Sequence, residues 1–371
     1  MVLQFHNESQ YSDLNWVGES IAETLMNEFG AANQIVLDRG SRAEGLRRLS
    51  LRPAAGFTKA TLIRLGQTLD ADYLWYGSYE AHLPQGSSQL KDSSIQISSH
   101  VIDLRKMRDG PDFLEAGSLS ELSRLEEHLA WQSLKYLQPA AAFKLEQFMA
   151  PDKLVREDAE ESYIRGLLSS SREQQQKWFT QALALDPRFS NAAFELGKLA
   201  LNRKDYHQAT AWLQRISPQD PRFAEARFKM GLSAYGTGDF SAAVNYFREV
   251  SKLFPLNEVY NNLGAAEDQL NLPAAIDDFR RALDGDQNDS TYLFNLGAAL
   301  LKSKYFDEAS KRFAAVLDRN PDDAEARALL DRAQRRDPGA PGAKSIAAER
   351  LKQNFDESAF RQLKAMIQPR G

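Results

Sequence analysis

The stretch of sequence that decides the fold is residues 228–255, "FKMGLSAYGTGDFSAAVNYFREVSKLFP". Two other stretches repeat its pattern in register: "FELGKLALNRKDYHQATAWLQRISPQDP" at 194–221 and "FNLGAALLKSKYFDEASKRFAAVLDRNP" at 294–321. One column of the pattern is glycine, at intervals of 34, 33 and 33 residues: Gly197, Gly231, Gly264 and Gly297. A second column is alanine, at intervals of 34, 32 and 34 residues: Ala209, Ala243, Ala275 and Ala309. A fixed period of this length predicts a solenoid of helix pairs.

Each column suggests a physical role. A glycine in the middle of a helix costs about 1 kcal/mol relative to alanine, so we expect it to let the two helices of a pair approach closely. We expect the alanine of the second helix to be the surface that the glycine meets. The residue four positions after each alanine is large and should fill the remaining gap: Leu213, Phe247, Phe279 and Phe313. Prolines close most units, because proline cannot continue a helix: Pro187, Pro221, Pro255 and Pro321.

These columns resemble the tetratricopeptide repeat. The resemblance implies an all-α superhelix with a concave groove, and a general role in binding other proteins. About five repeats with a capping helix are expected over 151–335. The first helix pair, 157–170 and 173–185, is an atypical terminal repeat, because Gln175 stands where the alanine belongs. The lone helix expected at 324–335 would cap the last repeat.

Residues 1–110 switch repeatedly between strand and helix patterns, which predicts a small α/β domain. Strands are expected at 2–5, at 35–37, at 72–79 as an inner strand, and at 95–101 after a hairpin loop. Helices are expected at 16–29, 42–49 and 59–69. Residues 111–150 should hold a packing helix, indicated by the leucines between 119 and 134, and a connector.

The first domain resembles the TolB-like amino-terminal domain found ahead of tetratricopeptide arrays in bacterial proteins. The resemblance rests on "LQFHN", "LNWVGESIAETL" and "LDADYLWYGSY…VIDLR". It implies a bacterial cell envelope or periplasmic location, with the cytoplasm as the alternative. Such domains usually follow a signal peptide and a longer opening strand. This sequence begins "MVLQFHNES" without a signal peptide, so we expect either a trimmed start or a start assigned too far downstream.

The final residues, 336–371, begin with the break "DPGAPG", after which apolar spacing predicts a helix over 344–367. Two roles are open for it. It either packs back onto the repeats or serves as a tail that binds a partner.

Composition argues against several functional classes. The 371 residues carry a formal net charge of −5 with both signs intermixed, so the clustered basic face of a nucleic-acid-binding protein is not expected. There is no cysteine, and no apolar stretch approaches the length of a membrane span. The five histidines are dispersed, and neither a phosphate-binding loop nor a Gly-x-Ser-x-Gly motif occurs. We therefore expect no cofactor, no metal and no enzymatic activity.

A polar column is the best candidate for a partner-binding site. Its members each stand two residues before a repeat glycine: Glu195, Lys229, Asn262 and Asn295. Two residues along a helix turn the side chain by about 200°, so this column should face away from the paired helix, into the groove. Such residues would stay hydrated until a ligand arrives. Asn262 and Asn295 resemble the asparagine ladder with which some tetratricopeptide grooves hold peptide main chain. The alternative is a solvated helix face.

An aromatic column stands three residues before the same glycines: Phe194, Phe228 and Phe294, with Asn261 in the fourth place. We interpret it as packing between repeats rather than as ligand contacts.

These observations predict a non-enzymatic scaffold or adaptor that binds a protein or peptide partner in the groove. Two rivals remain. One is a ligand sensor whose α/β domain binds a small molecule and signals through the repeats. The other is an enzyme whose site lies in the first domain.

Overall fold

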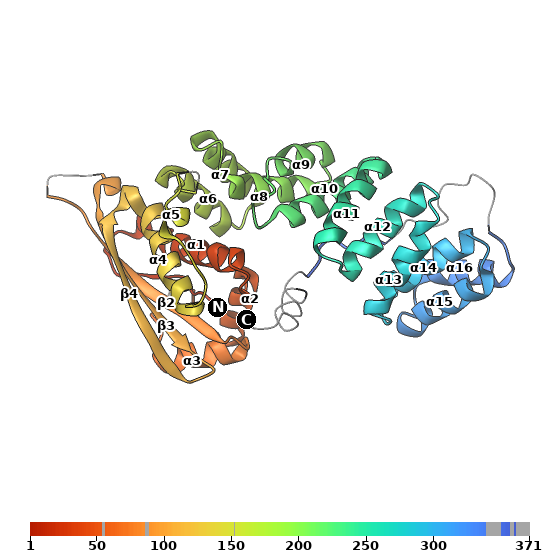
Figure 1. Cartoon of the computed structure of the whole chain (residues 1–371), viewed down its shortest axis with the longest axis horizontal. Helices are drawn as coiled ribbons and strands as arrows, with labels where there is room; N and C mark the ends of the chain where they lie inside the picture. The colour runs from red at the N-terminus through yellow and green to blue at the C-terminus, as the bar shows by residue number, and fades with distance from the viewer. Residues whose placement is uncertain (54–55, 86–88, 152, 339–349, 357–359, 361–371) are drawn as a thin grey trace. The chain divides into compact units, whose positions relative to one another are not determined.

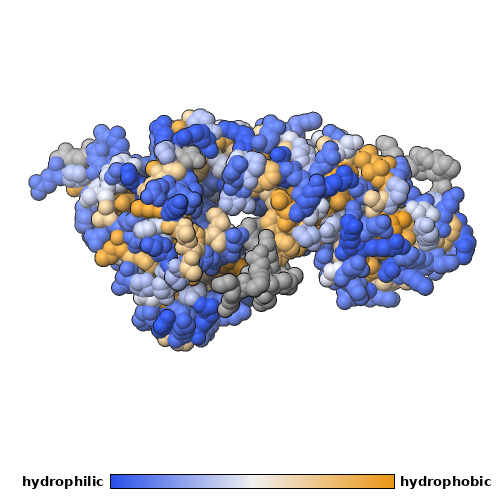
Figure 2. All heavy atoms as spheres, viewed as in Figure 1, coloured by the Kyte–Doolittle hydropathy of each residue, from blue (hydrophilic) through white to orange (hydrophobic). Residues whose placement is uncertain are grey.

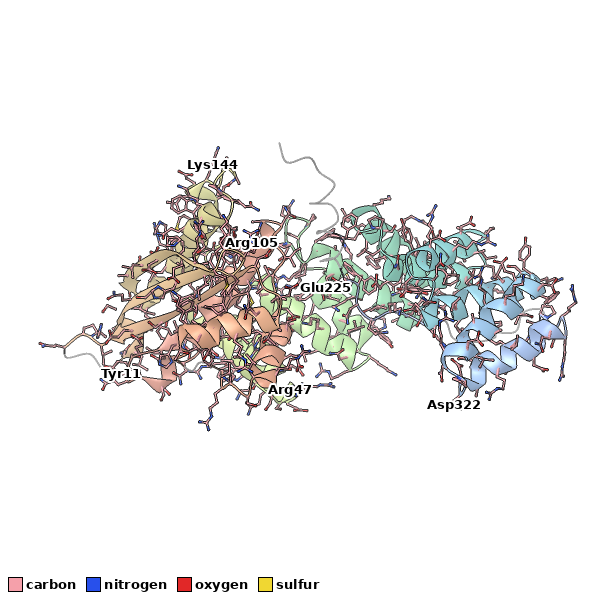
Figure 3. All side chains as sticks on the ribbon, turned by 90° about the horizontal axis from the view of Figure 1, so that it is seen from below. Tyr11, Arg47, Arg105, Lys144, Glu225 and Asp322 are labelled. Carbon is pink, nitrogen blue, oxygen red and sulfur yellow. The ribbon has the colours of Figure 1, made fainter. Side chains whose placement is uncertain are left out.

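The computed structural model describes residues 1–371 except 54–55, 86–88, 152, 339–349, 357–359 and 361–371. The chain forms two compact units, Met1–Ala192 and Ala193–Gly371. A small region with a four-stranded sheet is followed by a long series of helices (Figure 1), which confirms the predicted fold class. On the face seen in Figure 2, hydrophilic residues predominate and hydrophobic residues form smaller areas among them. Charged side chains such as Arg47 and Asp322 lie at the surface (Figure 3).

The sheet has the strand order β1-β2-β3-β4. Its strands are β1 (His6–Asn7), β2 (Tyr73–His82), β3 (Ser94–Asp103) and β4 (Arg108–Ser118). β1 pairs with β2 in parallel, whereas β2–β3 and β3–β4 are antiparallel. The aromatic strand β2 is therefore an inner strand, as the sequence predicts, and β3 is its hairpin partner.

Helices α1 (Val17–Ala31) and α4 (Leu122–Leu137) contact each other and the sheet. A cluster of aromatic rings holds these layers together, because Trp75 of β2 makes edge contacts with Phe29 and with Tyr136. The unit also contains α2 (Arg39–Arg48), α3 (Lys59–Thr68), the short α5 (Leu145–Phe148), and 3₁₀ turns at Ser12–Leu14, Leu90–Asp92 and Leu119–Glu121.

Three local predictions for this unit are wrong. The first strand is His6–Asn7 rather than the predicted 2–5, where Val2 makes only an isolated bridge with Trp75. Residues 35–37 form no strand, and Ile35 is 45% exposed. The strand β4 had not been anticipated, because its sequence "RDGPDFLEAGS" carries a glycine, a proline and several charges. Such residues are tolerated at an edge strand, whose outer backbone groups face solvent.

The helices that follow the sheet in the chain form consecutive antiparallel pairs, in agreement with the repeat pattern. Their bounds are α6 (Glu157–Leu168), α7 (Arg172–Leu185), α8 (Ser190–Asn202), α9 (Tyr206–Leu213), α10 (Phe223–Thr237), α11 (Phe240–Leu253), α12 (Asn257–Gln269), α13 (Ala274–Gly285), α14 (Ser290–Lys302), α15 (Phe306–Arg319) and the final α16 (Ala324–Gln334). The two helices contact each other in the pairs α6–α7, α10–α11, α12–α13 and α14–α15. In the remaining pair, Gly197 of α8 lies against the side chain of Leu213 of α9.

The glycine column meets a different neighbour from the one predicted. A Cβ atom at Gly297 would stand 2.9 Å from the ring of Phe313, and one at Gly231 would stand 2.6 Å from the ring of Phe247. The large residue four positions after each alanine thus lies against the glycine, and the alanine is not the nearest contact. At Gly264 the carbonyl oxygen of Ala275 also comes within 3.1 Å of the added atom. Close helix approach is retained, with the large side chain as the contact surface.

A second repeated feature lies in the turn between the helices of each pair. The residue seven positions after each glycine has positive φ: Lys204 (61°), Gly238 (81°), Asn271 (55°) and Lys304 (66°). This left-handed conformation is favourable for glycine and tolerated by asparagine, but costs more for lysine. The turn geometry is therefore conserved across repeats although the residue is not, which explains why no glycine column was visible there in the sequence.

A group of buried carboxyl groups joins α1, α4 and α6 within the first unit. Ser20 donates to Glu160 at 2.9 Å, and Thr24 donates to Glu126 at 2.8 Å. Burial, together with the neighbouring Glu160, raises the pKa of Glu126 well above its usual value, and burial also raises that of Glu160. Both shifts favour the neutral form of these carboxyl groups in the folded protein. Burial likewise raises the pKa of Glu127 to about 8.

We predict that Gly264→Leu unfolds or destabilises its repeat by about 1–3 kcal/mol, because the added side chain has no space between Phe279 and the backbone of α13. Thermal unfolding followed by circular dichroism measures the effect. Gly30→Ala is a suitable control, since a Cβ at that helical glycine meets nothing within 4 Å. An unfolding midpoint for Gly264→Leu equal to that of the wild type would contradict the pairing described above.

We predict that the free energy of unfolding falls as pH rises from about 5 to 8. A carboxyl group whose pKa is higher in the folded state favours folding most below its unfolded pKa of about 4.3, and this contribution disappears as pH rises through the folded pKa. Glu127→Gln should reduce this pH-dependent loss by about 2 kcal/mol, as judged by denaturant titration across the pH range. The exposed Glu146→Gln is the control. Parallel pH profiles for wild type and Glu127→Gln would show that Glu127 is not neutral in the folded protein.

Candidate functional site

A stretch near the end of the chain, residues 350–356, lies across the first helices of three repeats, α10, α12 and α14. These residues are not helical, which corrects the helix predicted for them. Phe360, which also belongs to the predicted helix, is helical. The remaining residues of that prediction, 344–349, 357–359 and 361–367, lie outside the described residues. Of the two roles left open by the sequence, the described contacts agree with the first, in which the segment packs back onto the repeats.

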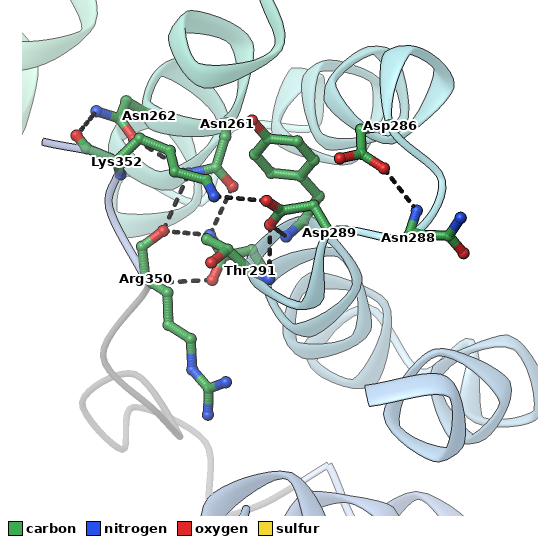
Figure 4. A network of polar contacts seen from close by, with 10 residues as sticks. Asn261, Asn262, Asp286, Asn288, Asp289, Thr291, Arg350 and Lys352 are labelled. Carbon is green, nitrogen blue, oxygen red and sulfur yellow. Dashed lines mark hydrogen bonds and ion pairs between the residues drawn. The ribbon is translucent and has the colours of Figure 1, made fainter. Parts of the chain in front are cut away.

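The main chain of this segment is held by the two asparagines of the predicted ladder, Asn262 and Asn295. Figure 4 labels Asn262 with Arg350 and Lys352 of the segment. Asn262 donates to the carbonyl oxygen of Lys352 at 2.8 Å and accepts from its amide at 2.9 Å. Asn295 does the same for Arg350, with both distances 2.9 Å. Each side-chain amide therefore binds the N–H and C=O of one residue at once, as a neighbouring strand of a sheet would.

A third asparagine links the other two. Asn261 donates to the carbonyl oxygen of Arg350 at 3.0 Å and to the side-chain oxygen of Asn262 at 3.1 Å. It also accepts from Asn295 at 2.8 Å. The sequence placed Asn261 in the aromatic column and assigned it no binding role; its position as the one polar member of that column was the signal. The network fixes the orientation of all three amides while they contact the main chain.

The segment crosses the repeats with a regular register. Residue 350 meets Asn295, residue 352 meets Asn262, and residue 354 meets Lys229. Each step of one repeat toward the N-terminus corresponds to two residues of the segment toward the C-terminus. Asn295 and Asn262 thus bind residues whose main-chain groups point to the same edge of an extended chain.

The side chain of Arg350 enters an acidic and aromatic site. Its guanidinium binds Asp323 through both nitrogens, at 2.7 and 3.0 Å, and reaches Glu325 at 3.2 Å. It lies 3.5 Å from the centre of the Phe294 ring, a cation–π contact. The hydrogen bonds from Arg350 hold the pKa of Asp323 below its usual value. Asp323 also caps α16 through the amide of Ala326.

The side chain of Lys352 enters a similar site one repeat earlier. Its ammonium group contacts Asp289 at 2.6 Å and lies 4.8 Å from the centre of the Tyr292 ring. Asp289 is at the same time the cap of α14, accepting from the amides of Thr291 and Tyr292. Two basic side chains, two residues apart, are therefore each matched by a carboxylate and an aromatic ring.

Apolar side chains of the segment contact the hydrophobic cores of the repeats. Leu351 packs against the clusters that contain Leu263 and Phe294. Phe355 makes an edge contact with Phe228 at 5.1 Å and a tilted contact with Phe254 at 5.8 Å. These contacts are hydrophobic and would add to the main-chain hydrogen bonds.

The remaining two members of the predicted column differ from each other. Lys229 donates to the side-chain oxygen of Asn354 at 3.1 Å and pairs with Glu225, labelled on α10 in Figure 3, at 3.2 Å. Glu195 instead pairs with Lys198 of its own helix at 2.9 Å. Three of the four predicted residues are therefore brought together by residues 350–354, and Glu195 is not one of those that hold this segment.

Two features of the prediction need correction. The column was expected to be hydrated, yet Asn262 and Asn295 are 0% and 1% exposed, because residues 350–352 cover them. The aromatic column was assigned to packing between repeats. Phe228 and Phe294 do contact Phe247 and Phe313 of their own repeats, but each also contacts the segment.

The part of the chain that the structure describes holds no group of three or more histidine, aspartate or glutamate side chains placed to bind a metal ion. Within the same residues, no helix combines the length and the apolar character needed to cross a membrane.

Comparison with known proteins identifies repeats in the helical part of the chain. Residues 176–222 and 228–290 match one family model of the tetratricopeptide repeat, and residues 268–333 match another. No curated protein matches the chain. The chain therefore contains tetratricopeptide repeats, as the sequence columns indicated.

Several solved structures are similar to part of the chain. YrrB, described as a tetratricopeptide repeat protein with an unusual peptide-binding site, is 18% identical, with a TM-score of 0.42 over 48% of this chain and 92% of that one. PilF of Pseudomonas aeruginosa is 21% identical, with a TM-score of 0.41 over 48% and 84%. MamA of Desulfovibrio magneticus RS-1 is 19% identical, with a TM-score of 0.41 over 45% and 96%.

Proposed function

We propose that this tetratricopeptide repeat chain is a non-enzymatic scaffold or adaptor that holds an extended segment of a partner protein in the groove of α10, α12 and α14. The proposal rests on four hydrogen bonds. Asn262 binds both the N–H and the C=O of residue 352, and Asn295 binds both groups of residue 350. A site that holds its own chain in this way has the geometry to hold another.

Main-chain recognition suits an adaptor because every peptide offers the same N–H and C=O groups. The four hydrogen bonds supply affinity for any extended chain, at about 0.5–1.5 kcal/mol net for each bond. Side-chain contacts beside them then decide which chain binds best. This division of roles is also what an extended peptide on the edge of a β-sheet uses.

The amino-terminal unit adds a proposal on location. Its resemblance to the TolB-like domain, on the motifs quoted above, supports a role in a bacterial cell envelope. We propose that this unit positions the repeats there, next to the protein that they bind.

The ladder is tested by Asn262→Ala/Asn295→Ala in the full chain. Loss of the paired bonds should release the segment, so the amides of Arg350 and Lys352 should exchange with solvent about 5–150-fold faster, the equivalent of about 1–3 kcal/mol. Amide hydrogen exchange read by NMR or mass spectrometry gives this number. The exposed Asn245→Ala on α11 is the matched control and should leave exchange unchanged.

The partner is then titrated against a variant in which the chain's own residues 350–355 bind the groove more weakly. This is needed because Asn262→Ala/Asn295→Ala lowers the affinity of the groove for the partner and for the chain's own segment alike. Leu351→Ala/Phe355→Ala provides this background. Adding the two asparagine substitutions to it should weaken the partner recovered from cell extract by about 1–3 kcal/mol. Equal affinities with and without the asparagines would place partner binding outside the groove and refute the proposed function.

A further inference from the structure

We propose that the groove is selective for an extended basic segment of the pattern basic–apolar–basic–any–polar–aromatic, and that residues 350–355, "RLKQNF", are an internal copy of this ligand that a partner segment must displace. The inference rests on the proposed function and adds the chemistry of the ligand and its competitor. Five of the six positions, all except residue 353, are specified by a described contact.

The two basic positions are specified by charge and by ring contacts together. At the first, Asp323 and Glu325 surround the guanidinium, and the bidentate geometry with Asp323 matches arginine better than lysine. At the second, Asp289 meets the ammonium group of Lys352. The rings of Phe294 and Tyr292 lie beside these cations. An acidic residue at either position would face a carboxylate and the negative face of a ring.

The apolar and aromatic positions are specified by the repeat cores. Leu351 contacts two core clusters at once, so a polar residue there would lose apolar burial on both sides. Phe355 lies between Phe228 and Phe254, which offer an edge and a tilted face to a third ring. Between them, Lys229 offers a donor to the oxygen of Asn354, so this position favours a hydrogen-bond acceptor.

The internal copy sets a threshold for the partner. Because α16 ends at Gln334, only a short stretch of sequence separates it from residue 350. A competitor on a short tether acts at an effective concentration of about 1 mM. A partner with the same intrinsic affinity is therefore excluded at micromolar concentration, and binds only if its segment fits better or its local concentration is high.

The test uses the full chain carrying Leu351→Ala/Phe355→Ala and two labelled synthetic peptides. The first has the sequence of residues 348–357, AERLKQNFDE; the second, AEELEQNFDE, has glutamate at both basic positions. Fluorescence anisotropy should show the basic peptide binding at least about tenfold tighter than the acidic one, a ratio that falls as salt rises. The wild-type chain should bind the basic peptide at least about tenfold more weakly than the variant, because its own segment competes.

The acidic sites are tested by Asp289→Asn/Asp323→Asn in the same background. Asparagine caps a helix about as well as aspartate, so both helix starts are retained while the charges are removed. The preference for the basic peptide should shrink by about tenfold or more. Asp277→Asn, on the exposed side of α13, is the control for a lost charge and should not alter the preference.

The possible outcomes separate the two proposals. Equal binding of both peptides would overturn the proposed selectivity but not the proposed binding of a partner main chain by the asparagines. Binding of neither peptide to the weakened-segment variant would overturn both. A basic preference with no gain over wild type would overturn the competition. Sedimentation gives a last check: wild type should stay monomeric, and a dimer that Leu351→Ala/Phe355→Ala abolishes would show that the segment serves a second copy instead.

Discussion

The match between an asparagine side chain and the backbone of an extended peptide is the constraint on which the groove depends. A side-chain amide presents one donor and one acceptor, and it can satisfy both main-chain groups of a residue only if the chain lies extended beside it. Two such amides can act on one chain only if they stand two residues, about 6.6–6.8 Å, apart along it. The stacking of Asn262 on α12 and Asn295 on α14 meets this condition. The stacking of the repeats therefore has to match the residue spacing of the bound chain.

This constraint also explains why the segment is not a helix. Leu351 and Phe355 are four residues apart, a spacing that places side chains on one face of a helix and equally on one face of an extended chain. The sequence alone favoured the helix. In the folded chain, the N–H and C=O groups of Arg350 and Lys352 bind asparagines, so they have no need of intrahelical partners. Tertiary contacts decided between two conformations that the pattern allowed.

The repeats were predictable because their columns reflect steric requirements that recur every 33 or 34 residues. What the columns could not give was the partner of each contact: the side chain nearest each glycine is leucine or phenylalanine, although at Gly264 the carbonyl oxygen of Ala275 is also close. The ladder was likewise located by counting from Gly264 and Gly297. Asp289 and Asp323 were not, because an aspartate before a helix is explained by capping alone, and the contact with a basic side chain depends on a segment distant in the sequence. In the first unit, β4 escaped notice because an edge strand needs little apolar alternation.

The groove binds two residues of ligand for each repeat, so recognition depends on the register of the bound chain. Side chains alternate between the two sides of an extended chain, so inserting one residue between the positions of Arg350 and Lys352 would turn every later side chain to the opposite side. Composition would be almost unchanged, yet recognition would be lost, whereas inserting two residues would preserve the phase and displace the pattern by one repeat. The number of repeats that carry a main-chain-binding asparagine then sets how many residues of the ligand are recognised. A ligand sequence is recognised only when it binds in the correct register.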